Sequence, residues 1–246
     1  MNSCNPYMIH LALEMGNSRF AYYQSLFGFG KITGIDLPGE TTGIVYGDRM
    51  TTIDAACNSF GQTINVNMMQ MMAAYCSIIN GGMLYQPHIV KRIESANGEV
   101  VKEYKANLVR QTITASTSKL LRRYLKNTVE EGTAKKAGVT GYSVAGKTGT
   151  AQKGDRKDNK WIISFIGHAP AENPKFAIYV VIDEPYGTTG TSGSSADVLT
   201  LTHNILEKLL PYMNVYKDAS DEYEDTSSSP DELTVDGIPA GTASSN

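Results

Sequence analysis

Apolar residues recur at helical spacing in several segments of the chain, and these segments predict helices. The expected helices span about 7–15, 19–27, 68–79, 117–131 and 195–212. In each, apolar side chains three or four positions apart share one face, as in an amphipathic helix. The segment 68–79 is apolar almost all round, which is typical of a helix buried on most sides, and we interpret its methionines as core filler. Leu120, Tyr124 and Thr128, and likewise Leu201 and Ile205, are among the residues expected to face the core.

Shorter runs have the composition of strands. Those over 88–95 and 99–104 flank Asn97-Gly98, a dipeptide typical of a tight hairpin turn. Those over 143–152, 161–169 and 176–183 follow one another through short connections, which predicts an antiparallel meander. Residues 31–50 are predicted to form a loop. The order of these elements indicates an α+β fold, with an antiparallel β-sheet flanked by helices.

Charge separates the C-terminal segment from the rest of the chain. Residues 216–246 contain one lysine against eight aspartates and glutamates, whereas the whole chain has a formal charge of −3. This segment is rich in Ser, Gly and Pro and nearly free of large apolar residues, so burial does not offset the entropy of ordering it. We predict one domain over residues 1–215 and a disordered acidic tail over 216–246. Because Lys and Arg form no runs elsewhere, we expect no nucleic-acid partner.

Cysteine and histidine patterns argue against a metal or cofactor site. Cys4, Cys57 and Cys76 form no C-x-x-C pair. The histidines are isolated from one another, and we interpret them as structural or surface residues. We therefore predict no metal ligands and no cofactor. The sequence has neither an apolar run long enough to cross a membrane nor the pattern of a signal peptide.

Lys147-Thr148-Gly149-Thr150 is the sharpest chemical signal, and it lies inside the predicted strand over 143–152. A glycine within a strand often marks a place where a ligand or another backbone comes close. A fixed positive charge and two hydroxyls around that gap suit the binding of a carboxylate beside an exposed strand edge. The alternative interpretation is an ordinary edge strand with a solvated lysine.

Ser3-x-Asn5 is a weaker signal at the start of the chain. Two residues at one fixed spacing often occur by chance. Either Ser3 or Asn5, placed ahead of Pro6, would also serve as a helix cap, and this is the alternative interpretation.

Several short motifs, taken in order, make the pattern specific. They are Ser3-Cys4-Asn5-Pro6, Phe27-Gly28-Phe29-Gly30, Thr33-Gly34-Ile35-Asp36-Leu37-Pro38-Gly39-Glu40, Phe60-Gly61-Gln62, Asn80-Gly81-Gly82, Glu131-Gly132-Thr133-Ala134 and Lys147-Thr148-Gly149-Thr150. In this order and spacing, residues 1–212 resemble the transpeptidase domain of class B penicillin-binding proteins, the division- and sporulation-type cell-wall synthases. Cys4 stands where the S-D-N motif of the wider family has Asp, a variation that class B enzymes share. The resemblance implies part of a β-lactamase/transpeptidase-like domain.

The resemblance implies a role for each motif residue. Ser3 would take part in proton relay to the leaving group, and the Asn5 amide would hold the substrate's peptide carbonyl and the catalytic lysine. Lys147 would supply positive potential near Ser3. Thr148-Gly149-Thr150 would bind, through its two hydroxyls, the terminal carboxylate of a D-Ala-D-Ala stem peptide or of a β-lactam antibiotic. The backbone N–H of Thr150 would form half of an oxyanion hole.

The nucleophile of this family lies in an S-x-x-K motif that precedes S-x-N, and only two residues precede Ser3. We therefore expect an N-terminally truncated chain, whose nucleophile and whose missing N-terminal half of the same domain lie outside it. The chain's only S-x-x-K, Ser116-Thr117-Ser118-Lys119, falls after Ser3 in an amphipathic surface helix. We interpret it as a helix start, with a relocated nucleophile as the alternative.

These expectations describe a fragment of a peptidoglycan D,D-transpeptidase that works by serine acyl transfer. The alternatives are a non-catalytic module that binds stem peptides or partner proteins, and a relative of D,D-carboxypeptidases and β-lactamases. The resemblance implies stem peptides, β-lactams and a cell-wall synthesis complex as partners. It places the full-length family at the extracytoplasmic face of the bacterial cell membrane.

Overall fold

The computed structural model describes residues 2–154, 157, 159–185 and 194–219. The predicted acidic tail beyond residue 219 lies outside the described residues. The helices are α1 (Asn5–Met15), α2 (Asn17–Leu26), α3 (Thr52–Ser59), α4 (Met68–Ile79), α5 (Ala115–Glu130) and α6 (Ala196–Tyr212), with short 3-10 turns η1 (Gly47–Arg49) and η2 (Lys135–Ala137). The strands are β1 (Met83–Tyr85), β2 (Arg92–Glu94), β3 (Val100–Glu103), β4 (Leu108–Gln111), β5 (Ala145–Lys153), β6 (Lys160–Ala169) and β7 (Phe176–Asp183).

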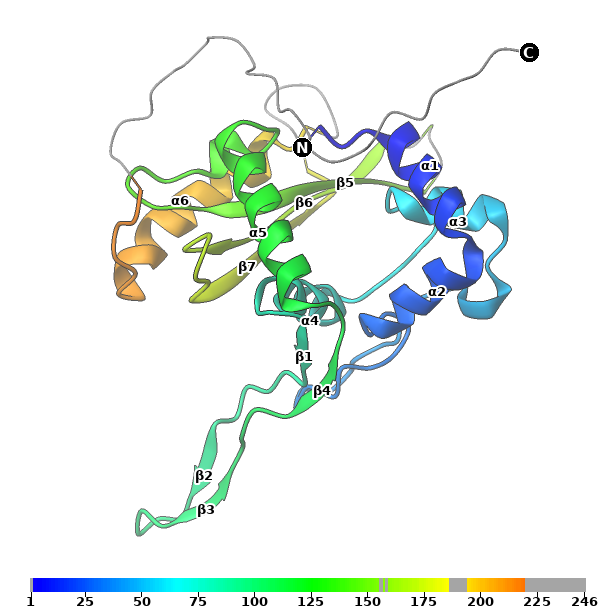
Figure 1. Cartoon of the computed structure of the whole chain (residues 1–246). Coiled ribbons are helices and arrows are strands. Elements are labelled where there is room, and N and C mark those ends of the chain that lie inside the picture. The colour runs from blue at the N-terminus through cyan, green and yellow to red at the C-terminus, as the bar shows by residue number, and fades with distance from the viewer. Residues whose placement is uncertain (1, 155–156, 158, 186–193, 220–246) are drawn as a thin grey trace, which may run out of the picture.

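A three-stranded antiparallel sheet in the order β5-β6-β7 lies at the centre of the molecule (Figure 1). The predicted meander is confirmed, because it consists of these three consecutive strands. On one face of the sheet, Ile163 and Phe165 of β6 are completely buried and belong to the same core as Val129 of α5 and Leu206 of α6. The main hydrophobic core of the described residues thus contains side chains of the sheet, of α5 and of α6.

Helix α4 lies against the sheet through a buried polar contact. Side chains alternate between the two faces of a strand, so His168 of β6 points away from the face that carries Phe165. The Nδ1 atom of His168 lies 2.7 Å from the Tyr75 hydroxyl of α4. The helix predicted over 68–79 is confirmed, although Met68 is 51% exposed and a polar residue of the helix, Gln70, is buried. The Gln70 amide is satisfied because it donates to two loop carbonyls.

The predicted inward faces of α5 and α6 were partly wrong. Leu120 and Tyr124 are 45% and 50% exposed, and Leu201 and Ile205 are 41% and 36% exposed. Thr128 is buried as predicted, and two small polar residues that were not predicted to face inward, Ser118 and Thr202, are also buried. The Thr128 and Thr202 hydroxyls donate to carbonyls one turn back in their own helices, so they need no water when buried.

Helix α3 falls in a segment for which no element was predicted. A reciprocal capping box fixes its start, because Thr51 and Asp54 each accept from the other's backbone N–H. The loop predicted over 31–50 is largely irregular but contains η1, and Ile44 forms an isolated bridge with Asn65. Both features are too short to leave a periodic pattern.

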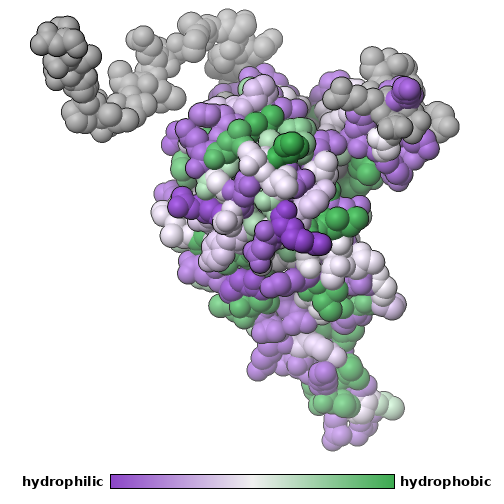
Figure 2. All heavy atoms as spheres, turned by 90° about the vertical axis from the view of Figure 1, so that its right-hand side faces the viewer, coloured by the Kyte–Doolittle hydropathy of each residue, from purple (hydrophilic) through white to green (hydrophobic). Residues whose placement is uncertain are grey.

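The hairpin around Asn97-Gly98 is confirmed but shorter than predicted, and it projects from the body as an arm (Figures 1 and 2). Its base is held by Asp36, whose carboxylate accepts from the backbone N–H groups of Ile89 at 2.7 Å and Val90 at 2.9 Å. These hydrogen bonds lower the pKa of Asp36. Between the arm and the body, β1 pairs with β4, a short ladder that was not predicted (Figure 1).

Within the described residues, no helix is long and apolar enough to cross a membrane. No group of three or more His, Cys, Asp or Glu side chains in this part of the chain is placed to hold a metal ion.

Candidate active site

Lys147 and Ser3 meet although 144 positions separate them in the chain. Lys147 lies on β5, an edge strand whose outer side has no paired strand among the described residues. Its Nζ donates to the Ser3 hydroxyl at 2.5 Å and to the Thr148 carbonyl at 2.9 Å. The structure thus joins the two sequence motifs at one end of the sheet, as the carboxylate-binding interpretation requires.

Two glycines let this part of β5 lie close to side chains of β6, the strand that pairs with it. A Cβ atom on Gly146 would lie 2.3 Å from Cζ of Phe165, which is inside the buried core and has no room to move. A Cβ on Gly149 would lie 2.6 Å from the Ser164 hydroxyl, which would have to rotate away. Gly146 is therefore required by packing, whereas Gly149 leaves the edge beside Lys147 free of a side chain.

The turn that carries Ser3 has an unusual backbone. Ser3 has a φ of +50°, in the left-handed region that non-glycine residues seldom occupy. Helix α1 begins at Asn5 behind Cys4, and no side chain caps it. The capping interpretation of Ser3 and Asn5 was therefore wrong. Instead the turn directs the Ser3 hydroxyl to Lys147, and a residue in a sparsely populated conformation often marks a functional site.

The ammonium group of Lys147 has no acidic neighbour in the described part of the chain. Burial lowers its pKa below the ordinary value of 10.5, and no carboxylate acts against this. Lys153, further along the same strand, shows the contrast, because Asp183 and Glu184 raise its pKa. A partly buried cation without a carboxylate partner attracts an anionic ligand and exchanges its proton more readily than a solvated lysine.

The other predicted site residues differ in exposure and in hydrogen-bond partners. The Thr148 hydroxyl lies 3.4 Å from the Thr133 hydroxyl, which belongs to the Glu131-Gly132-Thr133-Ala134 motif. Thr150 is exposed at the strand edge, and the Asn5 amide has no hydrogen-bond partner among the described residues. Thr133 was not predicted as a neighbour of the site, although its motif contributed to the resemblance.

Ser116 is remote from this cluster. It lies in the first turn of α5, where its hydroxyl is 2.9 Å from that of Thr114. Thr133, just beyond the opposite end of the same helix, contacts Thr148. At 1.5 Å per residue, α5 separates Ser116 from that end by roughly 20 Å. This geometry favours the interpretation of Ser116 as part of a helix start.

The comparisons with known proteins decide the family. A family model described as the penicillin binding protein transpeptidase domain matches residues 1–207. This chain belongs to that family. Stage V sporulation protein D from Bacillus subtilis is 41% identical to this chain over 219 residues, which cover 87% of this chain and 34% of that protein. PbpB of Mycolicibacterium smegmatis is 33% identical over 227 residues, covering 87% of this chain and 35% of that protein.

Solved structures confirm the transpeptidase fold. The crystal structure of penicillin binding protein 3 from Mycobacterium tuberculosis complexed with ampicillin is 31% identical, with a TM-score of 0.79. The match covers 88% of this chain and 50% of that one. The predicted α+β architecture, an antiparallel sheet flanked by helices, is therefore confirmed. This transpeptidase chain spans about a third of the length of the two curated relatives.

Proposed function

We propose that this chain forms the carboxylate-binding and proton-relay side of a serine D,D-transpeptidase site that cross-links peptidoglycan. The contact between Lys147 and Ser3 carries the proposal. Acyl transfer needs a positive group near the substrate's carboxylate and a hydroxyl that moves a proton, and the two motifs supply both at one place. In this role the chain works at the extracytoplasmic face of the cell membrane.

The proposed reaction assigns each group a step. A serine oxygen attacks the carbonyl of the penultimate D-Ala of a stem peptide, and the bond to the terminal D-Ala breaks. Ser3 relays a proton to the leaving amine, and the Asn5 amide holds the peptide carbonyl. Lys147 and the hydroxyls of Thr148-Gly149-Thr150 bind the terminal carboxylate. The outer edge of β5, which pairs with no strand in the described part of the chain, supports this assignment, because an extended peptide binds naturally beside an unpaired strand. A β-lactam would occupy the same place.

We further propose that the nucleophile belongs to an S-x-x-K segment outside residues 1–246, on an N-terminal half of the same domain. Two surfaces support such a partner. Helix α1 exposes large apolar side chains, including Tyr7 at 59% and Leu13 at 45%. Strand β7 is an edge in the described sheet, and its residues from Phe176 to Ile182 are half-buried and largely apolar. Exposed apolar patches and open strand edges are typical sites of further packing.

Covalent labelling with a fluorescent penicillin tests the proposal. The test compares the full chain alone with a chimera that joins it to the part of the Bacillus subtilis relative preceding the aligned region. We expect the chimera to be labelled and the chain alone to remain unlabelled. Lys147→Ala should abolish labelling of the chimera, whereas Lys153→Ala on the same strand should not.

Two results would contradict the proposal. A labelled serine in the chain alone would place the nucleophile within residues 1–246. A chimera that folds, as judged by circular dichroism, but takes no label would favour the non-catalytic binding module.

A further inference from the structure

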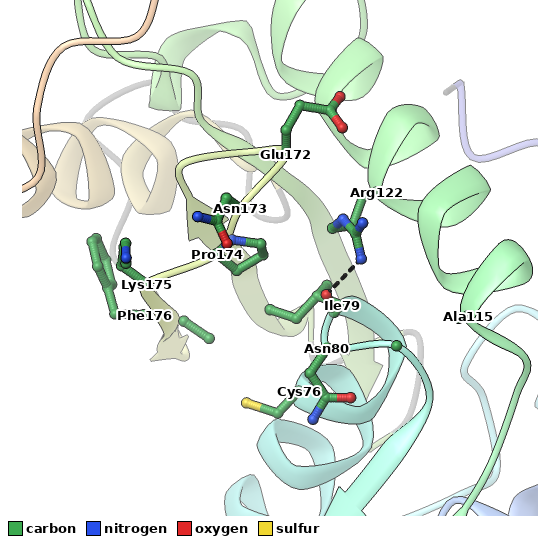
Figure 3. A pocket seen from close by; sticks show the side chains of 12 residues that line it. Cys76, Ile79, Asn80, Ala115, Arg122, Glu172, Asn173, Pro174, Lys175 and Phe176 are labelled. Atoms are coloured by element: carbon green, nitrogen blue, oxygen red, sulfur yellow. Dashed lines mark hydrogen bonds between the residues drawn. The ribbon is translucent and has the colours of Figure 1, made fainter.

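A cavity lies away from Lys147, where α4, α5 and the connection from β6 to β7 meet (Figure 3). Its volume is about 550 Å³. The end of α4 contributes Cys76 and Ile79, and α5 contributes Arg122. The connection contributes Pro174, and β7 contributes Phe176. None of the residues assigned to the transpeptidase site lines it. It is large enough for a small organic molecule.

Arg122 is the charged group directed into this space from α5 (Figure 3). Its Nη1 donates to the carbonyl of Ile79 at 2.9 Å and to the hydroxyl of Ser118 at 3.1 Å. Both partners are neutral, and they fix the guanidinium in place. The Nε atom is buried and has no hydrogen-bond partner in the structure. Buried guanidinium nitrogens are normally paired, so this one calls for an explanation.

The charge of Arg122 is not balanced by a carboxylate. Within the described residues it takes part in no ion pair, and Glu172, the acidic residue of the lining, is exposed. Burial is the larger cause of the lowered pKa of His168, which is about 4, and the positive charge of Arg122 also acts to lower it. Since an unbalanced, partly buried cation is unfavourable, an anion placed beside it is stabilised.

The rest of the lining is mixed: apolar side chains lie beside the polar groups of Asn80, Asn173 and Lys175. Its apolar part comes from Ile79, Pro174 and Phe176, and the small side chains of Ala115 and Ala177 also line it. A simple inorganic anion would leave this apolar part uncovered. A ligand with one negative head and a short apolar body would satisfy both parts of the cavity.

We propose that this cavity binds a small organic monocarboxylate, whose carboxylate pairs with Arg122 and whose apolar body packs on Ile79, Pro174 and Phe176. The guanidinium is held by its two neutral contacts, so little ordering is needed when the ligand binds. The site is separate from the one that recognises the stem peptide, and it does not depend on the proposed transpeptidase role.

Hexanoate is the test ligand, and hexanamide is its neutral counterpart of the same size. Titration calorimetry on the full chain should give hexanoate a dissociation constant of about 1 mM and hexanamide one at least about tenfold weaker. Arg122→Gln should weaken hexanoate about tenfold or more, because it removes a charge-assisted hydrogen bond. Arg123→Gln is the matched control, since Arg123 is the next residue and is exposed, and it should leave the affinity within about twofold.

The unmodified chain provides a readout that does not depend on whether the Gln variant folds. Methyl NMR signals of Ile79, Ala115 and Ala177 should shift on addition of hexanoate, and signals of Ala145 beside Lys147 should not. Equal affinities for hexanoate and hexanamide, or an unchanged affinity in a folded Arg122→Gln variant, would overturn the proposal. So would shifts confined to other residues, or no binding at about 10 mM ligand.

Discussion

The buried pair Tyr75–His168 offers a sharp test of how α4 is held on the sheet. The His168 Nε2 lies 3.1 Å from the carbonyl of Ala171, and a carbonyl only accepts, so Nε2 carries the proton. The opposite nitrogen, Nδ1, therefore accepts from the Tyr75 hydroxyl at 2.7 Å. Burial raises the pKa of Tyr75, which keeps this hydroxyl protonated. Replacing Tyr75 with Phe removes the donor and leaves Nδ1 buried and unpaired.

The magnitude follows from the burial of both partners. Tyr75 is 5% exposed and His168 is 1% exposed, so water does not replace the lost donor. An unpaired buried acceptor costs about 1–3 kcal/mol, and we expect Tyr75→Phe to lower the free energy of unfolding by about 2 kcal/mol. Tyr22→Phe is the control, because the Tyr22 side chain is largely exposed, and it should change the free energy by less than about 0.5 kcal/mol.

Urea unfolding of the full chain at pH 7, followed by circular dichroism, measures both variants. The double variant Tyr75→Phe/His168→Leu removes donor and acceptor together, and it should be less destabilised than the sum of its single variants. If Tyr75→Phe and Tyr22→Phe unfold at the same urea concentration, the assigned hydrogen bond does not stabilise the fold and the reasoning fails.

Three further predictions concern proton binding and the arm. Burial keeps the pKa of His168 at about 4, below its ordinary 6.5, so the unfolded chain binds a proton first as the pH falls. The free energy of unfolding should decline between those pH values by up to about 3 kcal/mol, and His168→Gln should flatten this decline in urea titrations. Because the pKa of Lys147 is lowered, the rate of penicillin labelling of the chimera should decline as the pH rises, with a midpoint below pH 10.5. Lys147→Arg, which stays charged, should remove that alkaline decline even if its labelling is slower overall. Asp36→Ala should speed hydrogen exchange at the amides of Ile89 and Val90, and unchanged exchange would show that Asp36 does not hold the arm.

Periodic segments were the part of the fold that sequence predicts well. The strand β7 begins and ends where its composition places it, and α6 begins one residue later than predicted. By contrast, β1 and β4 are only three and four residues long, too short for an alternating pattern to emerge. The buried faces of α5 and α6 were misplaced in part, because burial of Ser118 and Thr202 depends on hydrogen bonds to helix carbonyls, which a hydrophobic pattern does not register.

The candidate site, like the fold, was predicted from the sequence only in part. The composition around Lys147 indicates a carboxylate-binding strand, because charge, hydroxyls and glycine are local features. The contact between Lys147 and Ser3 is not local, and only the order of motifs shared with a known family predicted it. The neighbouring hydroxyl of Thr133 was missed, since its approach to Thr148 depends on how α5 leads into the turn before β5.

The central claim is that Lys147 and its neighbouring hydroxyls recognise a carboxylate beside Ser3. The most direct measurement is the rate at which the chimera is acylated by benzylpenicillin and by its carboxamide, in which a neutral amide replaces the carboxylate. We predict that the carboxamide reacts about tenfold or more slowly, and that Lys147→Gln removes most of this difference. Equal rates for the two compounds in the unmodified chimera would contradict the account.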